Sequence, residues 1–181
     1  LMKDVRPRFL PSLNFISTFP EFNLRTYVKY RDKSGVFFLT LDAQNKIICL
    51  FAPYAYGLPY RYALGSVQTD NNTYLWNSKR ISNLAELKGY CKPVGKYMTA
   101  SNGSLEEFLF ERYCLFTLIN DNLCIGYVAH KPWIYQKGEA ELEINSFTGV
   151  YKLGIKNLLK PDLVHISDGL KVKSWSIETL K

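Results

Sequence analysis

The segment at residues 22–30 alternates apolar with polar side chains, and this pattern restricts the fold more than any other feature of the sequence. A period of two residues is typical of a β-strand with one face against a core and the other toward solvent. One face carries Phe22, Leu24, Thr26, Val28 and Tyr30, and the other carries Asn23, Arg25, Tyr27, Lys29 and Arg31. A turn at residues 32–35 leads into the apolar run 36–41, which predicts burial on both faces. Together the two segments predict a β-hairpin.

The rest of the chain predicts further strands and two short helices. Asp42 is expected to cap a helix over residues 43–52, and Ser104 with Glu107 has the spacing of a capping box for a helix that ends near Arg112. The buried face of that second helix is expected to hold Leu105, Phe108 and Leu109. Strands are expected near 59–68, 73–79, 84–92, 114–120, 123–130, 163–167 and 170–176, and an extended loop at 9–21. Because no βαβ alternation occurs, we expect an α+β fold that is mainly antiparallel β.

Length and composition indicate one folded domain. The 181 residues are 47% hydrophobic and 22% charged, as in globular rather than disordered chains. The chain starts at Leu1, and its first eight residues have the pattern of neither a signal peptide nor a capped helix. We therefore expect a single domain over residues 1–181 that lacks an N-terminal segment.

Charge and cysteine usage restrict the partners and the compartment. The net charge is +7, but Lys and Arg are spread along the chain, so no nucleic-acid partner is expected. The longest uncharged stretch, residues 47–60, is too short to span a membrane. The four cysteines form no CxxC pair and no zinc-ligand spacing, which favours a reducing cytoplasm without a bound metal. No cofactor-binding fingerprint occurs either, so no cofactor is expected.

Several short segments, in one order along the chain, resemble the YqjF-like family, a domain family of unknown function. They are PEFNLRTYV at 20–28, GVFFLTLDA at 35–43, YGLPY at 56–60, SLEEFL at 104–109, ERY at 111–113 and HKPW at 130–133. This family is similar to the acetoacetate decarboxylase superfamily. The resemblance implies an antiparallel β-barrel or cone around a small-molecule pocket.

The same resemblance shows one important departure. The decarboxylases carry two lysines after a Gly-aromatic-Pro sequence, and one of these amines forms a Schiff base. Here the matching segment is Gly57-Leu58-Pro59-Tyr60-Arg61. A phenol cannot form an imine and a guanidinium stays protonated, so we expect no Schiff-base decarboxylation.

Seven residues are candidates for a pocket, and most have a structural alternative. The candidates are Glu21, Arg25, Tyr27, Tyr60, Arg61, Glu111 and His130. Arg25, beside Tyr27 on the polar face of its strand, is either a pocket cation that binds a carboxylate or a surface charge. We expect it in a cavity, within reach of Tyr60 or Arg61. Because neighbouring strand residues face opposite sides, Tyr60 and Arg61 cannot both line that cavity without a backbone irregularity.

The remaining candidates have equally simple alternatives. Glu21 could pair with Arg25, act as a general base, or be solvated. Glu111 is expected to pair with another segment, and the neighbouring Arg112 is explained by the helix dipole. His130 is either a hydrogen-bonded structural group or a proton carrier, whereas His165 is expected to be packed.

The sequence therefore predicts a small-molecule-binding domain for an organic acid or ketone, with a small organic anion as partner. The alternative is a non-enzymatic interaction or structural module whose barrel is filled by its own aromatic side chains. Polar groups that converge in a cavity favour the first function, and a packed aromatic interior favours the second. Whether the protein is an enzyme and how many copies assemble stay open.

Overall fold

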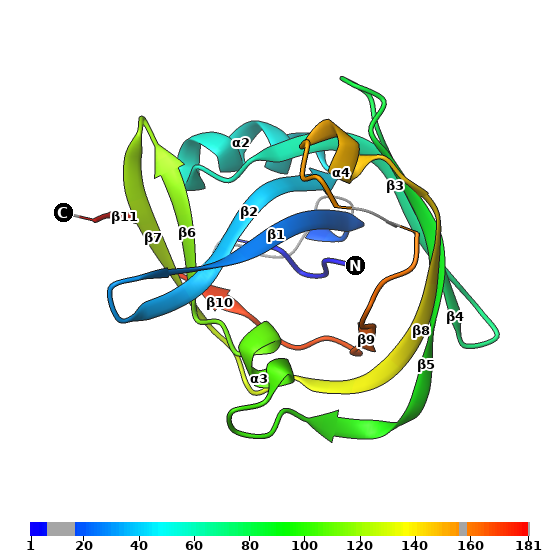
Figure 1. Ribbon diagram of the computed structural model, residues 1–181. Coiled ribbons are helices and arrows are strands. Elements are labelled where there is room, and N and C mark those ends of the chain that lie inside the picture. The colour runs from blue at the N-terminus through cyan, green and yellow to red at the C-terminus, as the bar shows by residue number, and fades with distance from the viewer. Residues whose placement is uncertain (7–16, 156–158, 181) are drawn as a thin grey trace.

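One curved sheet of eleven strands organises the part of the chain that the computed structural model describes, residues 1–6, 17–155 and 159–180 (Figure 1). The strands are β1 (Glu21–Tyr30), β2 (Lys33–Ala43), β3 (Tyr60–Asp70), β4 (Thr73–Arg80), β5 (Glu86–Thr99), β6 (Cys114–Ile119), β7 (Asn122–Ala129), β8 (Ile134–Asn145), β9 (His165–Ile166), β10 (Lys173–Ser174) and β11 (Glu178–Thr179). Residues 9–16 of the expected loop lie outside the described residues.

The sheet is mostly antiparallel, as the sequence predicted, but it is mixed. Its strand order is β10-β7-β6-β2-β3-β4-β5-β8-β9, with β1 paired to β2 and β11 to β7. β2 runs parallel to both β3 and β6. Figure 1 shows the sheet bending around a central space, toward which β9 and β10 bring its two ends. Those two end strands are two residues long each, and within the described residues the strand path does not close on itself.

The predicted hairpin is present, with one irregularity. β1 and β2 pair from Glu21↔Ala43 to Tyr30↔Lys33, and the register shifts between Leu24 and Arg25. This bulge interrupts the simple alternation, so Tyr27 and Val28 are both half-buried while Arg25 and Thr26 are both exposed.

Three helices occur in the described residues, one more than predicted: α2 (Lys46–Tyr56), α3 (Leu105–Phe110) and α4 (Phe147–Val150). The expected cap of the first helix was wrong. Asp42 belongs to β2, which continues its pairing with β1 and β3 through Ala43. Asn45 is the cap instead, and its side chain accepts a hydrogen bond from the Ile48 N–H at 3.0 Å.

Helix α3 begins where the sequence predicted but ends earlier. The Ser104 hydroxyl accepts from the Glu107 N–H at 3.1 Å, while the Glu107 carboxylate accepts from the Gly103 N–H rather than from that of Ser104. The helix ends at Phe110, before Arg112. Leu105 and Phe108 are exposed, against expectation, because so short a helix covers little of the sheet.

A buried ion pair joins β2 to β4. Arg80 donates from Nε to Asp42 Oδ2 at 3.0 Å and from Nη2 to Asp42 Oδ1 at 2.7 Å. The same Nη2 donates to Thr40 Oγ1 at 2.9 Å and lies 3.3 Å from the Tyr151 hydroxyl, next to α4. This network fixes the strands on the side of the sheet that α4 covers.

Strand β8 was not predicted, although it is twelve residues long. It pairs with β5 from Leu87↔Asn145 to Thr99↔Ile134. No helix of the described residues has the length and apolar character needed to cross a bilayer.

Candidate functional site

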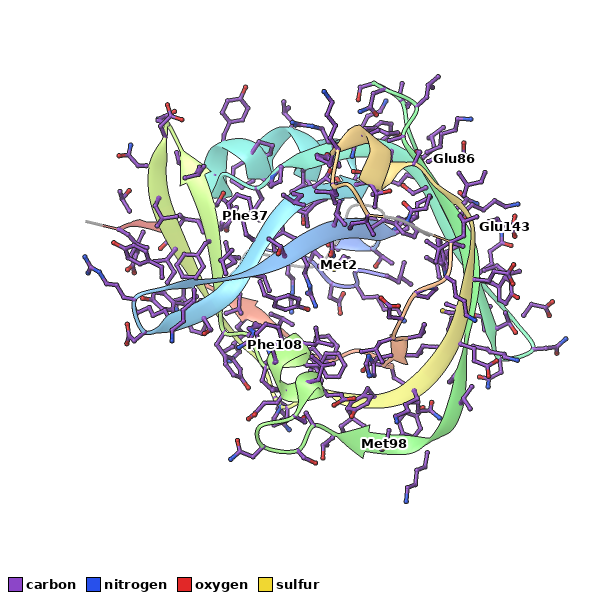
Figure 2. The ribbon with its side chains drawn as sticks, in the orientation of Figure 1. Met2, Phe37, Glu86, Met98, Phe108 and Glu143 are labelled. Carbon is purple, nitrogen blue, oxygen red and sulfur yellow. The ribbon has the colours of Figure 1, made fainter. Side chains whose placement is uncertain are left out.

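A cavity of about 440 Å³ lies among β1, β2, α3, β6, β7, β8 and β9. Its walls are mainly apolar, with Val36, Phe38, Leu109, Phe110, Leu115, Val128, Trp133, Tyr135 and Ile166 among the lining residues. Figure 2 shows Met2, another lining residue, in the space that the curved sheet surrounds. The ionisable side chains in the lining are Glu21, Arg25, Arg112, Cys114, His130, Tyr135 and His165. An apolar cavity with a few charged groups is the usual form of a small-molecule site.

Arg25 lines this cavity from β1, although its side chain is exposed, so it lies at the mouth. Its Nη2 donates to the Tyr27 hydroxyl at 3.3 Å. That hydroxyl in turn donates to the Leu109 carbonyl at 3.1 Å, and the Tyr27 ring packs 5.0 Å from the ring of Phe108. Tyr27 itself is not in the lining and instead connects β1 to α3.

Arg112 lies in the cavity wall with a donor that has no partner. Its guanidinium stacks over the Phe108 ring at 4.3 Å and lies 5.8 Å from the Tyr27 ring centre. Its Nε is buried and has no hydrogen-bond acceptor among the described residues. A buried donor left unpaired costs about 1–3 kcal/mol, and more when it is charged. Because the Nε has almost no exposed surface, a molecule in the cavity could reach this guanidinium only through its terminal nitrogens.

The sequence explained Arg112 by the helix dipole and did not predict this position. The helix ends before it, and Glu111 with Arg112 leads the chain from α3 into β6. The aromatic neighbours that hold the guanidinium come from β1 and from α3. The only sequence signal was the ERY motif at 111–113, which does not say which way the side chain points.

Glu21 lines the cavity on the same strand as Arg25 and is bound by Tyr60. The Tyr60 hydroxyl donates to Glu21 Oε2 at 2.7 Å. Burial raises the pKa of the Glu21 carboxyl, and the hydrogen bond from Tyr60 only partly opposes that shift. Burial also raises the pKa of Tyr60, and the nearby Glu21 charge adds to the effect. The pair is thus a phenol that keeps its proton beside a carboxyl able to take one up.

Tyr60 and Arg61 lie outside the cavity lining. Tyr60 contacts the lining through Glu21, and among the described residues no hydrogen bond joins Arg25 to Tyr60 or Arg61, so the structure does not show the predicted proximity. Arg61 is exposed, and its Nη1 donates to the backbone carbonyl of Tyr60 at 3.3 Å. The two residues follow the rule that neighbours on a strand face opposite sides.

His130 lines the cavity at the end of β7 and is held by backbone groups. Its Nδ1 lies 2.8 Å from the Lys131 carbonyl and its Nε2 lies 3.4 Å from the Arg112 carbonyl. Its ring stacks on Tyr113, with centroids 4.7 Å apart. The imidazole is therefore fixed beside Arg112.

Glu111 forms hydrogen bonds rather than the expected ion pair. Its Oε1 accepts from the Trp133 N–H at 3.0 Å, and its Oε2 accepts from the Tyr113 hydroxyl. It does not line the cavity but ties the end of α3 to the segment before β8. The hydrogen bond from Tyr113 to this carboxylate raises the pKa of the phenol to about 12.

His165 is packed, as expected, and also lines the cavity. Its ring lies 5.0 Å from Phe110 and 5.1 Å from Tyr135, and its Nε2 lies 3.5 Å from Glu106 Oε1. In the described part of the chain no three His, Cys, Asp or Glu side chains gather as metal ligands would.

Comparison with known proteins identifies the family and the fold. The DUF2071 family, described as an uncharacterized conserved protein, matches residues 1–171. Uncharacterized protein YqjF of Bacillus subtilis (strain 168) is 33% identical over 178 residues, which cover 98% of this chain and 73% of that protein.

Two solved structures are similar to this one. The first, titled Structural Studies of Acetoacetate Decarboxylase, has a TM-score of 0.61 at 11% identity and covers 91% of this chain and 69% of its own. The second, the acetoacetate decarboxylase of Legionella pneumophila, has a TM-score of 0.55 at 15% identity, with 91% and 64% covered. Because the identities are this low, the comparison shows only that the fold of this chain is similar to that of acetoacetate decarboxylases. The family match and the identity to YqjF show that the chain belongs to the DUF2071 family, as its ordered motifs predicted.

Proposed function

We propose that the cavity binds a small organic carboxylate with an apolar body. The observation that carries the proposal is the guanidinium of Arg112, which lies in the cavity wall and stacks on Phe108 rather than pairing with a carboxylate. A carboxylate oxygen in the cavity would accept from the terminal nitrogens of this guanidinium, and a bond between charged groups is about twice as strong as a neutral one. The apolar walls suit the rest of such a molecule.

The charges around the cavity support an anion over a cation. The lining contains two guanidinium groups, Arg25 at the mouth and Arg112 in the wall, but only one carboxyl, that of Glu21. Burial favours the neutral form of that carboxyl. These charged groups converge on open volume, which favours a binding cavity over an interior filled by its own aromatic side chains.

The proposed binding does not use Schiff-base chemistry. Imine formation needs a neutral primary amine, and Tyr60 occupies the position where the decarboxylases have their lysine. The cavity lining in the described residues includes no lysine. If the ligand undergoes a reaction, Glu21 is the group placed to exchange a proton with it. Borohydride reduction in the presence of acetoacetate should leave no adduct on the protein, and a trapped lysine adduct would contradict this part of the proposal.

Two further inferences concern the shape of the sheet around the ligand and the cellular location of the protein. We infer that the curved sheet acts as an incomplete barrel or cone around the ligand. We also infer a cytoplasmic protein, because Cys49, Cys91, Cys114 and Cys124 are all free thiols.

The test compares matched acids and amides by thermal unfolding. Benzoate should raise the melting temperature and benzamide, which has nearly the same shape without the charge, should not. A ligand at one hundred times its Kd stabilises a protein by about 2.7 kcal/mol, which is readily measured. Arg112→Met should remove the shift, Arg25→Met should weaken it, and Arg61→Met should leave it intact because Arg61 lies outside the lining. Equal shifts with benzamide, or an unchanged shift in Arg112→Met, would refute the proposal.

A further inference from the structure

Helix α2 is apolar on every side. Its sequence, KIICLFAPYAY, contains one charged residue, Lys46, and no acidic one. Its inner side packs on the sheet, with Ala52 buried and Ile48, Cys49 and Tyr56 half-buried. A helix on a protein surface normally carries polar residues on its outer side, and a helix that is hydrophobic all round is normally buried.

The outer side of α2 is instead a row of large apolar side chains. Ile47, Leu50, Phe51 and Tyr54 are 55%, 72%, 60% and 83% exposed, respectively. Their spacing of i, i+3, i+4 and i+7 places them on one face of the helix. We call these four residues the α2 stripe. Figure 1 shows α2 at the rim of the molecule, and within the described residues no other element covers its outer side.

The stripe is large enough to matter energetically. The four exposed fractions correspond to roughly 500 Å² of surface, near the upper end of the largest apolar patch on a typical monomer. A specific interface buries about 800 Å² on each partner. The stripe would supply more than half of that area, with its flanks providing the rest.

We propose that the α2 stripe is a homodimer interface, in which α2 packs antiparallel against α2 of a second copy. A twofold axis near Leu50 and Phe51 would pair the row with itself, since an isologous interface uses the same patch on both subunits. The row carries no charge, so two copies of a chain with net charge +7 can meet there without direct repulsion.

The charges at the ends of α2 support the antiparallel arrangement. Lys46 lies in the first turn, where the helix dipole disfavours a cation, and the last turn has no basic residue. In an antiparallel pair, each Lys46 would lie beside the last turn of the opposite helix, whose carbonyl groups favour a cation. A parallel pair would place the two Lys46 side chains together.

The test measures mass in solution as the concentration changes. With an interface of this size, sedimentation or light scattering should show a monomer–dimer equilibrium in the micromolar range. Leu50→Glu should shift the dissociation constant upward by at least tenfold. Leu84→Glu is the matched control, because Leu84 is 67% exposed in the turn after β4 and should leave the equilibrium unchanged. Circular dichroism checks that both variants fold, which is expected because neither side chain is buried.

Cross-linking tests the geometry independently of that substitution. Leu50→Cys, near the proposed twofold axis, should form an intermolecular disulfide on mild oxidation, and Leu84→Cys should not. A wild-type protein that stays monomeric up to millimolar concentration would overturn the proposal. So would a dimer that survives Leu50→Glu, or a protein of another kind that covers the stripe in place of a second copy.

Discussion

Arg80 and Arg112 are two arginines with buried guanidinium atoms, and they differ in what surrounds them. Arg80 donates to both carboxylate oxygens of Asp42 and to Thr40, inside the sheet. Arg112 lies between aromatic rings at the edge of a cavity, and its Nε has no acceptor among the described residues. The first group has its acceptors within the protein, whereas the second includes a buried donor without one.

The two buried carboxyl groups show the same contrast. Asp42 is paired with an arginine, whereas Glu21 is held by the Tyr60 phenol. A buried charge with a full set of partners holds strands together. A buried ionisable group that lines a cavity without an opposite charge beside it is a candidate for ligand binding. The following substitutions test this distinction, from the largest expected effect to the smallest.

Arg80→Met should destabilise the protein by about 3–5 kcal/mol, because it leaves the Asp42 carboxylate buried without its cation. The loss should appear as a lower denaturant midpoint. Lys79→Met, which removes the exposed neighbour that pairs with Glu86, should leave the midpoint nearly unchanged.

A double variant separates the attraction between the two charges from the free-energy cost of burying them. Arg80→Met with Asp42→Leu removes both charges, so it should be more stable than Arg80→Met alone. If Arg80→Met unfolds at the wild-type midpoint, the buried pair does not stabilise the sheet and the comparison fails.

Glu21→Gln should stabilise the protein above the carboxyl's ordinary pKa, by about 1 kcal/mol at pH 8. Burial raises the pKa of the Glu21 carboxyl in the folded state. The folded protein therefore binds the proton more tightly than the unfolded chain, and wild-type stability falls as the pH rises through that raised pKa. Glutamine keeps an oxygen for the Tyr60 hydroxyl and carries no charge. The gain should vanish below pH 4.5, the ordinary value.

The control for this pH dependence is Glu143→Gln, on the half-exposed side chain that pairs with Lys88. Unfolding midpoints of the three proteins across pH 4–8 measure the difference. A gain in Glu21→Gln that is the same at every pH would show that charge burial is not its cause.

The fold was largely predictable from residue periods and turns. The β1–β2 hairpin, the β6–β7 hairpin and the start of α3 all follow from local patterns of a few residues. Strand β8, IYQKGEAELEIN, was missed although residues 139–144 alternate Glu with Ala, Leu and Ile, which is the period-two pattern of a strand. Its strand conformation depends on pairing with β5, which is a long-range contact. α4 was missed because a four-residue helix has no measurable period.

The site was less predictable, since it depends on how distant segments meet. Of the seven pocket candidates, three line the cavity, Glu21, Arg25 and His130, and four do not, Tyr27, Tyr60, Arg61 and Glu111. Asp42 was read as a helix cap because its partner, Arg80, is 38 residues away. Arg112 was explained by a local rule, because the rings that hold it come partly from β1. Local rules describe elements well, but they do not say which side chains face one another.

Ser104→Ala should have a small effect on stability, about 0.5 kcal/mol, at the low end for a lost N-cap. The Ser104 hydroxyl satisfies the Glu107 N–H at the start of α3, which is short and partly exposed. Because α3 positions Phe108 under the Arg112 guanidinium, the variant should also weaken the benzoate response. Ser104→Asp, which keeps a capping oxygen, should behave like wild type in both measurements. If alanine leaves both unchanged, the cap does not hold the cavity wall in place.

Arg112→Met should change the stability of the ligand-free protein least of all. Removing the guanidinium gives up its stacking on Phe108, worth about 0.5–2 kcal/mol, and also removes a buried donor without a partner, worth a similar amount with the opposite sign. The two terms should nearly cancel, so the denaturant midpoint should lie close to that of wild type, while the stabilisation by benzoate is lost. Arg112→Lys keeps the charge but not the planar guanidinium, so it separates charge from geometry and should restore only part of the benzoate effect. A loss as large as that of Arg80→Met would show that Arg112 is a structural arginine with partners of its own, and the contrast between the two would no longer hold.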